Sequence, residues 1–189
     1  MTDEHARRSD DPDLALVRRM AAGEARALDE LYAQHGPSIL GFLVARLGDR
    51  QQSEEVLQDV MMAAWRNADS FRGDSSVRTW LLVIARNRAT NVLRKNRPTM
   101  MPIHDEFELS SADTGPQERV ERIDAARTVR RALDELPAQQ REVLTLVFFH
   151  QMTGPEVAAV LGITVGTVKS RLFRAKERLR GVLPEGGLL

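Results

Sequence analysis

The sequence predicts an all-α protein in which a flexible linker joins two small helical domains, the C-terminal one containing a helix-turn-helix. Apolar residues recur at helical spacing through almost every segment, and no segment shows the sustained alternation of a β-strand. Residues 96–117 contain three prolines and four acidic residues with little periodicity, as is typical of a linker. Residues 153–179 place a capping box, a glycine turn and a second capped helix in succession, which is the order of a helix-turn-helix.

The first domain is expected over residues 13–97, after a disordered acidic tail over residues 1–12. The predicted helices run from a cap at Asp13 to Gly23, from Glu24 to about His35, from Pro37 to Gly48, from a cap at Ser53 to Ala68, and from Val77 to Lys95. Residues 67–76 are polar and contain a glycine, so they are predicted to form a loop. The last helix must stop before Pro98, because the residue that precedes a proline disfavours helical geometry.

The linker is assigned to residues 98–119 and the second domain to residues 120–183. One helix is expected from about Val120 to Leu136, before Pro137, and another from Ala138 to about His150. Thr153 and Glu156 form the capping box of a short helix that ends at Gly162, and a further helix is expected from near Thr164.

The composition excludes several classes of site. The 189 residues include no cysteine, so disulfides, thiolate metal sites and a cysteine nucleophile are ruled out. The four histidines are isolated and no carboxylate cluster has metal-ligand spacing, so we expect no catalytic residue, metal or cofactor. The polar N-terminus is not a secretory signal, and no apolar stretch could span a bilayer. We therefore expect a cytoplasmic protein without membrane insertion.

The charge distribution points to a polyanionic partner. The formal net charge is zero, yet residues 78–97 carry six basic residues and no acid, and residues 164–183 carry six basic residues and one acid. Two basic helices in a neutral protein suggest two contacts with nucleic acid. Two solvated helix faces would be the alternative explanation.

The second helix of the helix-turn-helix combines an apolar stripe with a separate basic stripe. Val168, Leu172, Ala175 and Leu179 share the apolar stripe, whereas the basic stripe comprises Thr167, Ser170, Arg171, Arg174 and Arg178. A recognition helix needs such an arrangement, because its first turns enter the major groove while its other face packs on the domain. Arg171 and Arg174 suit guanine edges, whereas Lys169 and Arg178 suit phosphates. A helical hairpin with a solvated basic face remains the alternative.

The helix predicted over Val77–Lys95 carries a different polar stripe. Trp80, Asn87, Asn91 and Arg94 lie opposite its apolar face. An indole can stack on a base, amides can bind base edges, and a guanidinium can neutralise phosphate. Trp80 could instead anchor the core, and the pattern leaves this open.

Four short motifs in the first half make the chain recognisable: Leu57-Gln58-Asp59, Ser70-Phe71-Arg72-Gly73, Thr79-Trp80-Leu81 and Ile84-Ala85-x-Asn87. They resemble region 2 of extracytoplasmic-function (ECF) sigma factors of the sigma-70 family. Residues 136–143 and 162–175 resemble region 4 of the same family, in matching order and spacing.

The resemblance implies a sigma factor that directs bacterial RNA polymerase core to specific promoters, as in stress responses. Region 2 would melt and capture the −10 promoter element, with Phe71, Arg72, Trp80, Asn87, Asn91 and Arg94 near the melted strand. Region 4 would read the −35 element through Thr167, Lys169, Ser170, Arg171, Phe173, Arg174 and Arg178, and would meet the β flap of polymerase. Gln58, Asp59 and Met62 would bind the β′ clamp helices of the core. An anti-sigma factor would control the protein.

Two other functions compete with this one. A one-component transcription regulator would use only the helix-turn-helix and bind duplex DNA as a dimer, but it would not need a second basic helix. An enzyme that acts on nucleic acid would need a catalytic cluster that the sequence lacks. The sequence does not identify the promoter, the inducing signal or the anti-sigma factor.

Overall fold

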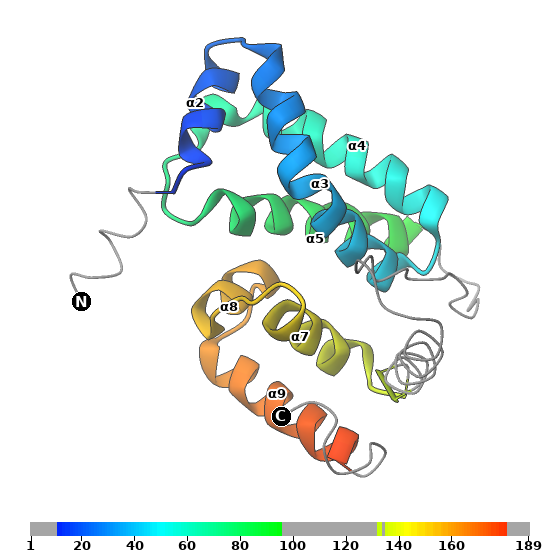
Figure 1. Ribbon diagram of the computed structural model, residues 1–189. Coiled ribbons are helices and arrows are strands. Elements are labelled where there is room, and N and C mark those ends of the chain that lie inside the picture. Colours follow the sequence, from blue (N-terminus) through cyan, green and yellow to red (C-terminus); the bar gives the residue numbers. More distant parts are fainter. Residues whose placement is uncertain (1–10, 96–131, 134, 181–189) are drawn as a thin grey trace, which may run out of the picture. The chain divides into compact units, whose positions relative to one another are not determined.

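The computed structural model describes residues 11–95, 132–133 and 135–180, and the chain divides into two compact units that are described separately. Throughout these residues the regular structure is helical, which confirms the predicted all-α fold (Figure 1). The predicted linker and residues 1–10 of the predicted tail lie outside the described residues, as does most of the helix expected before Leu136.

The first unit contains α2 (Leu14–Ala21), α3 (Ala25–Leu47), α4 (Arg50–Arg66), the 3-10 turn η1 (Ala68–Ser70) and α5 (Val77–Lys95). α3, α4 and α5 pack against one another, and α2 packs against α3 and η1. Their shared core is made of large aliphatic and aromatic side chains that are almost completely buried: Leu31, Ile39, Phe42, Leu43, Val60, Leu81 and Leu82. The bounds of α5 agree with those predicted from the sequence.

The prediction of two separate helices between Glu24 and Gly48 is wrong, because α3 runs through Pro37 without a break. An interior proline costs about 3 kcal/mol. Leu31, Ile39 and Leu43 lie on both sides of the proline and are at most 1 % exposed. Burial of each such side chain contributes about 1.5–3 kcal/mol, so together they outweigh the proline. The predicted end of the helix is confirmed, since Gly48 adopts the left-handed conformation with φ 74°.

One predicted helix start, at Ser53, and one predicted capping side chain, that of Asp13, are also wrong. Asp49 caps α4, since its carboxylate accepts the N–H of Gln52 at 2.7 Å, and Ser53 lies inside the helix with its hydroxyl donating to the Asp49 carbonyl. Asp13 precedes α2 but makes no capping hydrogen bond, because its carboxylate is turned toward α3.

An exposed ion-pair network joins α2 to the beginning of α3. The Arg19 guanidinium donates to Glu24 and to Glu30, the latter at 2.9 Å. Hydrogen bonds from Arg19 hold the pKa of both carboxyl groups below the ordinary value.

The second unit contains α7 (Ala138–Phe148), most of α8 (Gly154–Leu161) and α9 (Val165–Arg180). α7 packs against α9. Their core includes a cluster of buried apolar side chains, against which Leu133 and Leu172 lie partly buried: Ala132, Leu136, Leu144, Ala175 and Leu179. His150 is buried at 4 % exposure in the turn that follows α7.

The predicted capping box at the start of α8 is present in part. The Glu156 carboxylate accepts the backbone N–H of Thr153 at 2.8 Å, which is the reciprocal half of the motif. The Thr153 hydroxyl donates to the same carboxylate oxygen at 2.7 Å. Among the helices described, none has the length and apolar character needed to cross a bilayer.

Candidate nucleic-acid interface

The turn between α8 and α9 fixes the start of the candidate recognition helix. Gly162 has φ 61°, a conformation that costs glycine little and other residues more. The Thr164 hydroxyl then accepts the N–H of Thr167 at 3.2 Å and lies 2.9 Å from the Thr167 hydroxyl. This is the predicted cap, and it satisfies one of the free donors at the start of α9.

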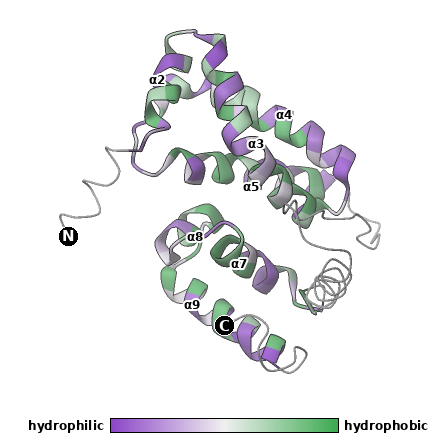
Figure 2. Ribbon diagram, in the orientation of Figure 1, coloured by the Kyte–Doolittle hydropathy of each residue, from purple (hydrophilic) through white to green (hydrophobic). Residues whose placement is uncertain are grey.

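α9 has the two faces that its sequence predicts. Val168, Ala175 and Leu179 are buried and Leu172 is half-buried, so this side packs against the rest of the second unit. Ser170, Arg174 and Arg178 are exposed, whereas Thr167 and Arg171 are partly buried. Figure 2 shows hydrophilic and hydrophobic residues alternating along α9, as an amphipathic helix requires.

The remaining predicted residues of α9 lie outside the basic stripe. Lys169 is exposed, and Phe173 is 65 % exposed, the largest value among the exposed large apolar side chains of the described residues. The Lys176 ammonium lies 5.4 Å from the centre of the Phe148 ring, so this side of α9 also contains a cation–π contact that the sequence did not predict.

In the first unit, the structure brings two predicted residues together. The rings of Phe71 and Trp80 stack with centroids 4.6 Å apart and an interplanar angle of 28°. Phe71 follows η1, and Trp80 lies in the first turn of α5. Both side chains are half-buried. Trp80 is therefore neither a buried core anchor nor fully exposed, and the pair forms an aromatic surface where the beginning of the loop meets the first turn of α5.

Asn87, Asn91 and Arg94 continue from Trp80 along α5, and all three are exposed. Asn87 lies seven residues beyond Trp80, which is about 10 Å along a helix and on the same side. Arg72, in the loop, is also exposed. An aromatic surface followed by amides and a guanidinium can stack on bases, bind base edges and neutralise phosphate.

The third predicted group lies on α4. Gln58, Asp59 and Met62 are all exposed and lie within about one turn of one another, while the neighbouring Leu57, Val60 and Met61 are buried. Met62 is 48 % exposed. A carboxylate, an amide and an apolar side chain side by side form a surface suited to a protein partner better than to DNA.

A buried polar cluster was missed by the sequence interpretation. His35, which appeared isolated, lies 2.7 Å from a carboxylate oxygen of Asp13, and both residues are 7 % exposed. The residues of such a cluster are far apart in the chain, and no local pattern marks them. Among the described residues there is no group of three or more His, Cys, Asp or Glu side chains that could hold a metal ion.

Comparisons with known proteins match both units. The family model for Sigma-70 region 2 matches residues 31–99, and that for Sigma-70, region 4 matches residues 126–179. The chain is 35 % identical over 176 residues to the RNA polymerase sigma-H factor of Pseudomonas aeruginosa, covering 88 % of this chain and 91 % of that protein. It is 37 % identical over 158 residues to the ECF RNA polymerase sigma factor RpoE of Cereibacter sphaeroides, covering 82 % and 84 %.

Solved structures give the same picture. CnrH in complex with the cytosolic domain of CnrY is similar with a TM-score of 0.66 and 30 % identity, covering 89 % of this chain and 95 % of that one. The sigma factor RpoE of Bartonella quintana, in complex with the anti-sigma factor NepR, is similar with a TM-score of 0.66 and 25 % identity, covering 84 % and 97 %.

Proposed function

We propose a division of labour between the two units of this chain, which belongs to the extracytoplasmic-function sigma factors of the sigma-70 family. As such a factor, the chain directs bacterial RNA polymerase core to specific promoters and starts transcription there. Residues 13–97 form region 2, which binds the core and captures the −10 element. Residues 120–183 form region 4, which reads the −35 element.

The capture of the −10 element is assigned to the loop after η1 and to the exposed stripe of α5. Extrusion of a base from the duplex costs a few kcal/mol of stacking, so the captured strand needs a stacking surface. The stacked rings of Phe71 and Trp80 provide one. Arg72 is exposed next to Phe71 in the loop, where it can contact the displaced strand. Further along α5 the exposed residues that can contact the same strand are Asn87, Asn91 and Arg94.

The −35 element is assigned to α9. Its capped first turn and its exposed basic face are the features that a recognition helix needs in the major groove. Arg171 and Arg174 are placed on base edges, and Lys169 and Arg178 on phosphates. Thr167, Ser170 and Phe173 complete the surface.

Binding of the core polymerase is assigned to the exposed patch of Gln58, Asp59 and Met62 on α4, which contacts the β′ clamp helices. Region 4 contacts the β flap. An anti-sigma factor controls the chain, as the complexes of its structural relatives suggest. The chain needs no catalytic chemistry, because polymerase forms the RNA bonds, and it works in the cytoplasm beside polymerase and DNA.

One observation favours the function of a sigma factor over that of a one-component regulator: the first unit presents its own aromatic and amide surface, separate from the helix-turn-helix. A sensor domain has no use for it. The test is holoenzyme assembly, in which purified chain and core polymerase are offered duplex −35 DNA and single-stranded −10 DNA separately. A sigma factor in the holoenzyme binds both probes, whereas a one-component regulator binds duplex alone and without core.

A further inference from the structure

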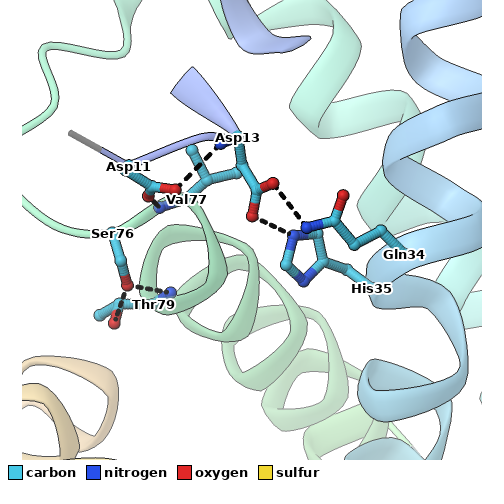
Figure 3. Close-up of polar contacts among 7 residues, drawn as sticks. All are labelled: Asp11, Asp13, Gln34, His35, Ser76, Val77 and Thr79. Carbon is cyan, nitrogen blue, oxygen red and sulfur yellow. Dashed lines mark hydrogen bonds and ion pairs between the residues drawn. The ribbon is translucent and has the colours of Figure 1, made fainter. Parts of the chain in front are cut away.

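The start of α5 is capped by a residue from the N-terminal end of the described chain (Figure 3). The Asp11 carboxylate accepts the N–H of Val77 at 2.8 Å, across 66 residues of sequence. Val77 is the first residue of α5, where backbone donors lack a partner within the helix. A local cap is present as well, because the Ser76 hydroxyl accepts the N–H of Thr79 at 3.2 Å. α5 therefore has both a local and a remote cap.

The remote cap is itself held firmly. The second oxygen of Asp11 accepts the N–H of Asp13 at 3.0 Å. The Asp13 carboxylate is bound by two side chains of α3, accepting from Gln34 Nε2 at 2.6 Å and lying 2.7 Å from His35 Nε2. Figure 3 shows these contacts following one another from Gln34 and His35 through Asp13 and Asp11 to Val77. Residues 11–14, named here the capping segment, thus connect α3 to the start of α5.

The capping segment also reaches the loop between η1 and α5. Leu14 Cδ1 lies so close to Gly73 that a Cβ added there would be 3.8 Å from it. α2, which begins at Leu14, packs against η1. The loop of residues 71–76, named here the capture loop, is therefore held at its beginning through η1 and at its end through Val77, and Leu14 lies beside its middle at Gly73.

We propose that the capping segment positions the capture loop and the stacked pair of Phe71 and Trp80 for the single-stranded −10 element. The inference rests on the function proposed above for that pair. A loop that is already ordered binds a strand without paying the entropy of its own ordering. Asp11 and Asp13 are accordingly positioning residues: they contact no DNA, yet their loss weakens capture of the strand.

The test uses full-length chain in which Trp65→Phe leaves Trp80 as the sole tryptophan. Asp11→Ala removes both acceptors, Asp11→Asn keeps one, and Asp49→Ala is the matched control that removes an aspartate cap from α4 instead. Acrylamide quenching of Trp80 fluorescence reports the stacked pair without DNA. Holoenzyme binding to a single-stranded oligonucleotide of a −10 element mapped for this holoenzyme reports capture, and binding to core reports assembly.

We expect Asp11→Ala to increase quenching of Trp80 and to weaken oligonucleotide binding about fivefold, as for loss of a capping contact, with core binding unchanged. Asp11→Asn should fall between Asp11→Ala and the parent in both readouts and remains informative if Asp11→Ala does not fold. Asp49→Ala should lower the thermal midpoint without changing either readout.

Equal quenching and equal oligonucleotide affinity for Asp11→Ala and its parent would overturn the inference and leave the proposed function intact. A change in quenching without a change in affinity, or the same loss of affinity in Asp49→Ala, would overturn it too. Failure of the parent holoenzyme to bind the oligonucleotide would refute the proposed function, and the inference with it.

Discussion

Substitution of Arg171 and of Lys169 by alanine should separate base reading from phosphate binding on α9. The two residues are two positions apart, which is about 200° around a helix, so they face nearly opposite sides. Arg171 shares its side with Thr167 and Arg174, while Lys169 is exposed and lies off that side. If the basic stripe faces the floor of the groove, Arg171 can reach the base edges and Lys169 cannot.

The expected magnitudes follow from these positions. A guanidinium that binds one guanine at two points contributes about 1–3 kcal/mol of discrimination, or roughly 5- to 150-fold. Arg171→Ala should lose that discrimination at one base pair of the −35 element. Lys169→Ala should weaken all sequences alike and reduce the slope of log affinity against log salt by about one.

The assay is binding of holoenzyme to matched and singly substituted −35 duplexes across a salt series. Arg180→Ala is the matched control, because Arg180 lies at the end of α9 and pairs with Glu177. It should leave both discrimination and the salt slope close to those of the parent. A uniform loss of affinity in Arg171→Ala, with discrimination retained, would refute the placement of α9 in the groove.

Three further substitutions test the other assignments. Trp80→Ala should weaken binding of single-stranded −10 DNA by about 1–3 kcal/mol, whereas Trp80→Phe should retain most of it because a ring can still stack on Phe71; equal losses in both variants would argue against stacking. Asp59→Lys should weaken binding to core polymerase, by about tenfold if one contact of ~1.4 kcal/mol is lost. Binding to the −35 duplex should not change, and an unaltered affinity for core would contradict the assignment of this surface to core binding. Leu146→Ala should lower the free energy of unfolding in urea by about 2–5 kcal/mol, because Leu146 is fully buried. Phe149→Ala, at an exposed position, should change it by less than about 0.5 kcal/mol, and similar losses in both variants would contradict the assigned burial.

The sequence predicted the elements whose signals are local. The bounds of α5, the cap at Thr164 and the two faces of α9 all follow from helical periodicity and capping chemistry within a few turns of chain. The continuity of α3 through Pro37 could not be predicted in this way. It depends on burial against α4 and α5, which a local pattern does not contain.

The candidate site shows the same division. The exposure of Asn87, Asn91 and Arg94 agrees with the predicted stripe, because a helix fixes which residues share a side. The stacking of Phe71 on Trp80 depends on the path of a loop, and the contacts of Asp11 and Asp13 span 66 and 22 residues. Aspartates near a helix start resemble local caps in sequence, so their remote partners emerge only from the fold.

The central claim, that the two units act together as a promoter-specific initiation factor, is tested most directly by transcription from a promoter mapped for this chain, with purified core polymerase. The account predicts that transcripts start at one site only when the chain is present, and that alteration of either the −10 or the −35 element strongly reduces them. Chain-independent initiation, or initiation that survives alteration of the −10 element, would contradict it.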